Sequence, residues 1–470
     1  MQTYPIYAAG EFITTAYALE VKNPHDGNVI ARTWQADQQV LEKCIVAAQS
    51  VQTVLREMPS HKRFSILRKI SDQITANRHH LATVLCRESG KPMRYALGEI
   101  DRAAQTFLVA AEEAKRLPKE YLSLDWTPAG ERKEGLVKYF PIGIVAGIAP
   151  FNFPMNLAVH KIAPAIAAGC PIILKPASST PLSTLELARI IDETELPKGA
   201  VSVLPMNRVA GNALVTEERF ALLSFTGSPE VGWEMKKNAG KKKVILELGG
   251  NAGVIVARTA ELDQALKKCL VGGYAYSGQI CIHAQRIFVH SSLFSTFVQR
   301  FAEMVKALKN GNPEDNATDI GVMIDEDNAK RVESWVNEAV AAGAKILCGG
   351  HRDKTYYHPT LITNTNSQMK VCREEIFGPV VTVEPFDNFS DAVHMINDTR
   401  FGLQAGVFTN DMNEVDFAFN EIQTGGVIVN DVPTFRVDHM PYGGIKDSGL
   451  GREGVKYAIH DMLEARILVK

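Results

Sequence analysis

Between residues 142 and 250, short apolar runs alternate with longer stretches that have helical periodicity. The apolar runs are 142–149, 172–174, 201–204, 222–225 and 244–248. Strands that alternate with helices of about ten to fifteen residues are typical of a doubly wound parallel sheet. The predicted fold class of this part of the chain is therefore α/β.

The residues before this region are predicted to be mainly helical after a short strand-rich start. Ser60 is a candidate N-cap of a helix, and Gly90–Pro92 is expected to end this helical region. A second amphipathic helix is expected over 93–116. Residues 120–140 alternate polar and apolar positions around a Pro-Ala-Gly turn, which predicts a hairpin. This hairpin either lies over the domain or reaches a neighbouring subunit.

A second α/β region is predicted from residue 252 to about residue 430. It begins with the apolar run Gly-Val-Ile-Val-Ala and closes with Gly-Gly-Val-Ile-Val-Asn. At 470 residues the whole chain is too long for one hydrophobic core, so two or three domains are expected.

Charge and composition exclude several classes of partner. The formal net charge of −2 gives no field that would attract nucleic acid or an anionic membrane. Residues 141–160 carry no Lys, Arg, Asp or Glu, but Pro141, Pro150 and Pro154 interrupt them, which indicates a buried strand and turn rather than a membrane span. The N-terminus lacks the basic-then-apolar layout of a signal peptide, so a cytoplasmic protein is expected.

The distribution of cysteines also indicates a cytoplasmic protein. They are seven in number, scattered along the chain, and none forms a Cys-x-x-Cys pair. This distribution is unlike a disulfide framework or a zinc site and favours a reducing compartment. No metal site is expected.

Polar residues follow several of the predicted strands directly. Asn152, Lys175, Gly227 with Ser228, and Glu247 each stand where an apolar run ends. Ligands bind a doubly wound sheet at the carboxyl ends of its strands. The sequence therefore predicts a binding site formed by these residues.

Cys281 is the candidate nucleophile. It lies in a polar turn between a helical run and the strand-like 286–290. A cysteine taken alone is more often an ordinary buried residue. Together with Glu247 as a base and Asn152 as an amide donor, however, it completes the set of groups that acyl chemistry through a thioester requires.

A dinucleotide site is indicated by a variant of the usual fingerprint, because Gly-x-Gly-x-x-Gly is absent. Phe225-Thr-Gly227-Ser228 leads from a strand into a helix whose N-terminus can bind a phosphate, although a tight strand–helix turn alone also explains this pattern. Lys175 either binds ribose hydroxyls or extends to solvent from a strand end. The Ser178 hydroxyl can donate to a 2′-phosphate that a carboxylate at this position would repel.

Taken together, these motifs resemble the aldehyde dehydrogenase superfamily in order and spacing, over essentially the whole chain. The resemblance includes Glu375-Ile-Phe377-Gly-Pro and the later Pro-Tyr-Gly-Gly-x-Lys-x-Ser-Gly. It implies an NAD(P)-binding domain, a catalytic domain and a small β oligomerisation element, assembled as a homodimer or homotetramer. The implied boundaries are 1–119 and 141–247 for the NAD(P)-binding domain, 248–440 for the catalytic domain, and 120–140 with 455–470 for the oligomerisation element.

The resemblance also implies a mechanism. Cys281 attacks an aldehyde, the Asn152 amide and the backbone N–H of Cys281 hold the oxyanion, and Glu247 activates the water that releases the acid. Lys161 stands where the family has a lysine near the active site; its alternative is a solvated helix face. Asn430 likewise stands near the family's site or has a structural role.

The cofactor implied by the resemblance is NADP or NAD. Glu375 resembles the residue that holds the nicotinamide ribose, with Phe377 beside the ring. Most NAD-preferring members have a glutamate where Ser178 stands, so NADP is the expected preference. The implied cofactor-binding residues are Lys175, Ser178, Gly211, Phe225, Gly227, Ser228, Gly249, Glu375 and Phe377.

The expected substrate is a small polar aldehyde, because the chain most resembles the lactaldehyde, succinate-semialdehyde and non-phosphorylating glyceraldehyde-3-phosphate group. Arg102 and Arg436 are candidate anion-binding residues, and His283 either lines the substrate pocket or packs inward. Ile280 replaces an arginine of the glyceraldehyde-3-phosphate enzymes, which disfavours a phosphorylated substrate. A CoA-acylating enzyme, disfavoured by Glu247, and a catalytically silent cofactor-binding relative are the remaining alternatives.

Overall fold

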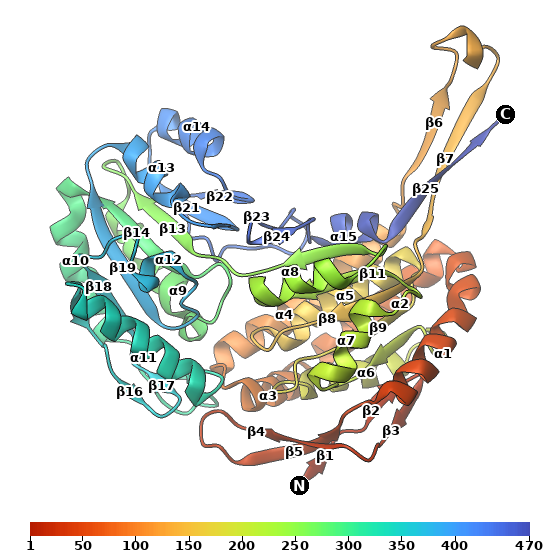
Figure 1. Cartoon of the computed structure of the whole chain (residues 1–470), viewed down its shortest axis with the longest axis horizontal. Helices are drawn as coiled ribbons and strands as arrows, with labels where there is room; N and C mark the ends of the chain where they lie inside the picture. Colours follow the sequence, from red (N-terminus) through yellow and green to blue (C-terminus); the bar gives the residue numbers. More distant parts are fainter.

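The computed structural model describes residues 1–470 and contains a central eight-stranded sheet (Figure 1). Its strand order is β24-β12-β11-β8-β9-β10-β2-β3. The middle strands β12, β11, β8, β9 and β10 are all parallel. At the two edges, β24 and β2 run antiparallel to them, and β3 pairs antiparallel with β2. The predicted α/β fold with a doubly wound sheet is confirmed. The strands are β2 (Ile6–Ala8), β3 (Glu11–Ile13), β8 (Ile144–Ile148), β9 (Ile172–Lys175), β10 (Val201–Val203), β11 (Phe220–Thr226), β12 (Lys243–Glu247) and β24 (Gly449–Leu450).

Helices cover both faces of this sheet because successive strand residues point to opposite sides. In β8, Val145 packs with α2, α4, α5 and α6, whereas Ile144 and Ala146 pack with α1, α7 and α8 on the other face. The helices are α1 (Gln38–Glu57), α2 (Ser60–Ala76), α3 (Arg78–Ser89), α4 (Met93–Ala114), α5 (Pro154–Ala168), α6 (Leu182–Asp192), α7 (Arg208–Thr216) and α8 (Pro229–Asn238).

One predicted helix boundary is wrong. The N-cap of α2 is Pro59, and Ser60 is the first residue inside the helix, with no side-chain cap. Proline restricts its own φ to a value that suits the position before a helix, so the chain turns one residue earlier than the Ser60 signal suggests. The predicted stop is confirmed: Gly90 ends α3 in the left-handed conformation, with φ 68°.

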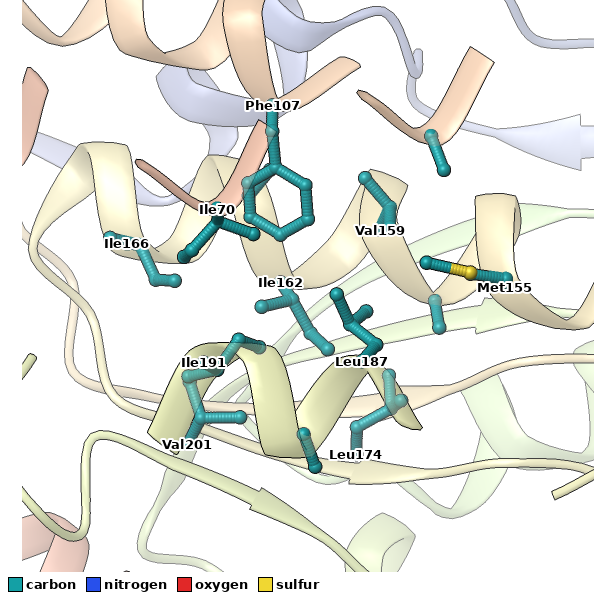
Figure 2. Close-up of a cluster of buried hydrophobic side chains, with 14 of the residues drawn as sticks. Ile70, Phe107, Met155, Val159, Ile162, Ile166, Leu174, Leu187, Ile191 and Val201 are labelled. Carbon is teal, nitrogen blue, oxygen red and sulfur yellow. The ribbon is translucent and has the colours of Figure 1, made fainter. Parts of the chain in front are cut away.

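Helix α5 lies at the centre of the largest hydrophobic cluster, and every residue of α5 is buried. Figure 2 shows Phe107 of α4 between Ile70 of α2 and Val159 of α5, above Ile162. This packing holds α5 rigidly against the sheet, and α5 begins just after Asn152.

The second α/β region forms a separate seven-stranded sheet of order β15-β18-β19-β14-β13-β21-β22. Only β15 runs antiparallel to its neighbour. The strands are β13 (Ala252–Val256), β14 (Ala284–His290), β15 (Lys345–Cys348), β18 (Thr360–Thr363), β19 (Val380–Phe386), β21 (Gln404–Phe408) and β22 (Gly426–Val429). The helices are α9 (Leu262–Tyr274), α10 (Ser291–Lys306), α11 (Glu326–Ala341), α12 (Lys370–Arg373), α13 (Phe389–Asn397) and α14 (Met412–Glu421).

The predicted hairpin forms a three-stranded sheet with the end of the chain. Strand β7 (Glu134–Pro141) pairs with β6 (Lys119–Ser123) on one side and with β25 (Leu463–Val469) on the other. The short helix α15 (Val455–Asp461) precedes β25 in the chain. Figure 1 shows this sheet projecting beyond the rest of the molecule rather than lying over it. Trp126 on its turn is 91% exposed.

A smaller sheet lies near the N-terminus, with β5 (Val29–Trp34) between β1 (Gln2–Thr3) and β4 (Ala18–Lys22). Short two-residue strands complete the structure: β16 (Arg352–Asp353), β17 (Tyr356–Tyr357), β20 (Phe401–Gly402) and β23 (Ile445–Lys446). No helix has the length and apolar content required to cross a membrane.

Because Phe107 is fully buried, Phe107→Ala is expected to lower the free energy of unfolding by about 3–5 kcal/mol through lost burial and a residual cavity. Denaturant unfolding followed by circular dichroism measures this change. The control is Val209→Ala at a side chain that is 85% exposed, where no comparable loss is expected. Equal effects of the two substitutions would contradict this packing of α4 on α5.

Candidate active site

A cavity of about 520 Å³ lies between the two large sheets and collects residues from distant parts of the chain. Strand ends of the first sheet contribute one wall, and the turn around Cys281 contributes another. The predicted site residues that line the cavity are Asn152, Gly227, Ser228, Glu247, Gly249, Cys281, Glu375, Phe377 and Arg436. Tyr442 and Glu453 also line it, and sequence reasoning assigned neither of them to the site.

Cys281 follows a strained turn. Tyr276 and Ser277 both have left-handed backbone conformations, with φ 48° and 54°. Such conformations are unfavourable for residues with side chains and persist only where the surroundings hold them. The Ser277 hydroxyl donates to the carbonyl oxygen of Gly321 at 2.8 Å and thereby anchors the turn.

The Cys281 sulfur lies 3.1 Å from the hydroxyl oxygen of Tyr442. Burial raises the pKa of the Cys281 thiol to about 11, although the contact with Tyr442 lowers it. Without ligands, the thiol is therefore protonated at neutral pH. The motif that contains Tyr442 was visible in the sequence, but only the folded chain brings its hydroxyl to the sulfur.

Asn152 lies directly beyond the end of β8 and is 5% exposed. Its side-chain Nδ2 donates to the carbonyl oxygen of Gln279, two residues before Cys281, at 3.0 Å. The side chain of Asn152 is thus in direct contact with the turn that leads to Cys281.

Glu247 ends β12, and both of its carboxyl oxygens are buried without a hydrogen-bond partner. Burial raises the pKa of Glu247 well above its usual range, and the nearby Glu453 carboxylate raises it further. A carboxyl group in this environment resists ionisation and has no protein partner, so it is available to exchange a proton with a bound water.

Behind Glu247 lies a buried group of charges. The Glu453 carboxylate pairs with Arg436 at 3.1 Å and with Lys161 at 3.4 Å. Although burial opposes its ionisation, Lys161, His160 and Arg436 hold the pKa of Glu453 at about 2. Burial lowers the pKa of Lys161. Burial also opposes the charge on Arg436, but Glu453 together with Tyr442 and Asp438 offsets it and raises the pKa of Arg436.

Lys161 therefore does not lie on a solvated helix face. It is fully buried, and its Nζ donates to the hydroxyls of Ser224 at 3.1 Å and Thr226 at 2.8 Å. It lies behind the cavity wall rather than on it.

A second groove adjoins the cavity at Glu230 and contains Lys175, Ser178, Gly211 and Phe225 among its lining residues. The groove runs to helix α8, whose first turn has no side-chain cap, so its amides are free to bind a phosphate. The Lys175 ammonium has only a weak contact, 3.5 Å from the carbonyl oxygen of Pro176.

The residues of this groove and of the adjacent cavity fit an extended dinucleotide. At Gly249, an added Cβ would collide with a carboxyl oxygen of Glu375, so a larger residue there would displace this carboxyl group. Glu375 accepts a hydrogen bond from the Gly250 amide at 3.0 Å, and burial raises its pKa to about 7. Phe377 lies edge-on to Phe151, with ring centroids 5.9 Å apart.

Two candidate substrate residues lie away from the cavity wall. Arg102 donates to Asp438 at 2.7 Å instead of lining the cavity. His283 packs inward, with its Nε2 2.7 Å from the carbonyl oxygen of Gly273. Of the two alternatives for His283, the structure therefore shows inward packing, and His283 does not line the cavity. Asn430 accepts a hydrogen bond from the Thr409 amide at 3.0 Å and also lies outside the cavity.

Comparison with known proteins relates the whole chain to one family. A family model described as "Aldehyde dehydrogenase family" matches residues 12–468. The chain is 42% identical over 470 residues to 3-sulfolactaldehyde dehydrogenase of Priestia aryabhattai, covering 100% of this chain and 98% of the relative.

Solved structures agree with this relationship. Aldehyde dehydrogenase 21 of Physcomitrella patens, in complex with the reaction product succinate, superimposes with a TM-score of 0.98 at 44% identity, over 100% of this chain and 98% of that one. Glyceraldehyde-3-phosphate dehydrogenase GapN of Methanocaldococcus jannaschii, complexed with NADP, gives a TM-score of 0.92 at 36% identity, over 96% and 98% of the two chains.

Because the pKa of the Cys281 thiol is raised to about 11, alkylation of Cys281 by iodoacetamide in the cofactor-free protein is expected to accelerate about tenfold per pH unit between pH 7 and 10. The thiolate is the reactive form, and below the pKa its fraction rises with pH. Mass spectrometry of the Cys281 peptide measures the rate, with Cys281→Ala correcting for the other cysteines. A rate that is already constant above pH 7 would show that the thiol is activated at rest.

Proposed function

This chain belongs to the aldehyde dehydrogenase family, and on that basis we propose that it oxidises a small polar aldehyde to its carboxylic acid through a thioester on Cys281. The observation that carries the proposal is the convergence of Cys281, Asn152 and Glu247 on one cavity, although they are far apart in the sequence. A nicotinamide dinucleotide is the family's oxidant, and the adjoining groove supports its binding.

In the proposed first step, the Cys281 sulfur forms a bond to the aldehyde carbon, the C=O π bond breaks, and the thiol proton passes to water. The negative charge that develops on the aldehyde oxygen is held by the Asn152 side-chain amide and the Cys281 backbone N–H, each contributing about 3–4 kcal/mol in comparable sites. A nicotinamide dinucleotide held in the groove beside Lys175 and Ser178 would supply the oxidising power by accepting a hydride from this adduct, which would leave a thioester on Cys281.

Glu247 then acts on the thioester through water. Its carboxylate takes a proton from a water molecule that attacks the thioester carbon, and the acid leaves as the Cys281 sulfur is released. Because the pKa of Glu247 is raised, its carboxylate forms at higher pH than that of an ordinary glutamate, so this step is favoured as the pH rises. The presence of this base supports hydrolysis to the free acid over transfer to CoA.

We propose that the aldehyde carries an anionic group and that Arg436 recognises it. The Arg436 guanidinium lines the cavity and is almost fully buried, and its Nε has no hydrogen-bond partner. Two basic side chains, Arg436 and Lys161, pair with the single carboxylate of Glu453 beside this part of the cavity. The relatives named for 3-sulfolactaldehyde and crystallised with succinate act on or release molecules of this kind. Semialdehydes that carry a carboxylate and sulfonated derivatives of lactaldehyde are thus the proposed substrates, and lactaldehyde itself, which is neutral, is the alternative among small polar aldehydes.

Glyceraldehyde 3-phosphate is the alternative substrate, supported by the likeness to GapN and opposed by the apolar Ile280 beside the nucleophile. The catalytically silent alternative requires a defect in the reacting groups, whereas Cys281, Glu247 and Asn152 are all present. An assay of cofactor reduction separates these possibilities.

We also propose the domain division and the assembly. Residues 1–119 with 141–247 would form the NAD(P)-binding domain, supported by the eight-stranded sheet, and 248–440 would form the catalytic domain, supported by the seven-stranded sheet. The projecting sheet from 120–140 and 455–470, with exposed Trp126 and Leu468, would join subunits into a cytoplasmic homodimer or homotetramer.

The proposed reaction is tested by absorbance of the reduced nicotinamide when lactaldehyde, succinate semialdehyde, 3-sulfolactaldehyde or glyceraldehyde 3-phosphate is offered with NADP or NAD. Reduction is expected with at least one of the anionic non-phosphorylated aldehydes and is expected to vanish in Cys281→Ala. In Glu247→Gln, a burst of about one reduced cofactor per active site followed by turnover slowed about 10²-fold is expected, because thioester forms but is not hydrolysed.

No reduction with any of these aldehydes by a protein that binds the cofactor would contradict the proposed oxidation and favour the silent alternative. A Glu247→Gln variant that turns over at the wild-type rate would instead contradict the role of Glu247 alone.

We also predict a preference for NADP over NAD, and this preference depends on Ser178. Ser178 lines the groove with Lys175 and is half-buried, so a carboxylate there would repel a 2′-phosphate. Ser178→Glu is expected to lower kcat/KM for NADP at least about tenfold and to change kcat/KM for NAD less than about threefold. Ser178→Ala is the control for loss of the hydroxyl alone. An equal loss with both cofactors in Ser178→Glu would contradict the assignment.

A further inference from the structure

We propose that Lys91 is a positioning residue for the oxyanion hole, holding Asn152 against the nucleophile turn through one buried ammonium group. This inference rests on the proposed function of Asn152 in the oxidation. Lys91 lies between α3 and α4, outside the cavity, and is 0% exposed.

The ammonium group of Lys91 contacts the amide side of the site directly. Its Nζ donates to the backbone carbonyl oxygen of Asn152 at 2.7 Å and lies 3.8 Å from the ring centroid of Phe153. The same Nζ pairs with the Glu99 carboxylate, whose second oxygen accepts hydrogen bonds from the Met155 and Asn156 amides, both at 3.1 Å. Lys91 and Glu99 therefore hold Asn152 and the first turn of α5 together.

The ammonium group also contacts the nucleophile side. It lies 4.3 Å from the ring centroid of Tyr276, which is in the strained turn that leads to Cys281. The Tyr276 hydroxyl donates to the carbonyl oxygen of Ser89 at 3.3 Å, two residues before Lys91. The cation thus contacts both the Phe153 ring, next to Asn152 in the chain, and the Tyr276 ring, in the turn before Cys281.

A stabilising role alone does not explain a lysine at this position. A buried ion pair is often no more stable than apolar side chains of the same size, because both charges lose their hydration. Apolar side chains could not donate a hydrogen bond to the Asn152 carbonyl oxygen. This hydrogen bond fixes the backbone of Asn152, whose side-chain amide must meet the oxyanion. Displacement of a catalytic group by about 1 Å can lower a rate about 10²-fold.

The test is a double-mutant cycle between Lys91 and Asn152. Lys91→Met combined with Glu99→Gln removes the ammonium without leaving a buried carboxylate unpaired, and the glutamine that replaces Glu99 still offers an oxygen to the α5 amides. Asn152→Ala removes the amide. Glu88→Gln is the matched control, because Glu88 is an equally buried carboxylate that accepts hydrogen bonds from the Leu182 and Ser183 amides of α6, away from the cavity.

The double variant K91M/E99Q is expected to lower kcat about 10²-fold while KM for the nicotinamide cofactor changes less than about twofold. Asn152→Ala is expected to lower kcat about 10²- to 10³-fold. If Lys91 acts through Asn152, the triple variant loses no more than about threefold beyond Asn152→Ala, whereas a generally destabilising role predicts that the losses multiply. Glu88→Gln is expected to keep the wild-type kcat.

A second readout separates this inference from the proposed function. Hydrolysis of p-nitrophenyl acetate by Cys281 needs the oxyanion hole but neither an aldehyde nor a cofactor, so it is measured in the same cycle. If the wild-type protein hydrolyses the ester but oxidises no aldehyde, the proposed oxidation fails while the ester cycle still tests Lys91. If K91M/E99Q keeps the wild-type rate in both assays, or if its loss multiplies with that of Asn152→Ala, the role of Lys91 is refuted.

Should K91M/E99Q not fold, the same cycle is run with Lys91→Gln in place of Lys91→Met. The glutamine retains a neutral donor, so a smaller loss is expected, again without further loss when Asn152→Ala is added. Multiplying losses in this cycle would refute the inference equally.

Discussion

Burial of charge between two sheets is the constraint on which the site depends. A carboxylate removed from water must find a cation or give up its charge. Glu453 meets Arg436 and Lys161 and remains ionised, whereas Glu247 has no partner and its pKa rises. The same burial raises the pKa of the Cys281 thiol to about 11. The electrostatic state of the reacting groups is therefore set by where the chain places the few compensating cations.

The precision of the site comes from rigid elements rather than loops. Asn152 lies between β8 and the wholly buried α5, and Lys161 is on α5 itself, so packing around Phe107 also limits the movement of both groups. Cys281 depends on a turn in a left-handed conformation that the Ser277 hydroxyl anchors. These rigid supports belong to different sheets, which is why a link such as Lys91 between them affects the chemistry and not only stability.

Local sequence patterns predict much of the fold. They fail where contacts with other chain segments determine the position of a side chain or the end of a helix. The strand runs of the parallel sheet are predictable because each is short, apolar and followed by a helical pattern. The start of α2 is predicted one residue late, since Pro59 ends the preceding segment before Ser60 can cap the helix. The inward packing of His283 and the pairing of Arg102 with Asp438 depend on chain segments that no local pattern reveals.

By itself, the sequence determined the α/β class, the placement of polar residues at the ends of parallel strands, and the candidates Cys281, Glu247 and Asn152. These follow from hydrophobic periodicity and from residue types at strand ends, which are local properties. Only the tertiary structure decided which side chains meet. It brought Tyr442 to the Cys281 sulfur, Glu453 to Lys161 and the Lys91 ammonium to the Asn152 carbonyl. Contacts between residues so far apart depend on how two sheets pack, and a one-dimensional pattern carries no information about that distance.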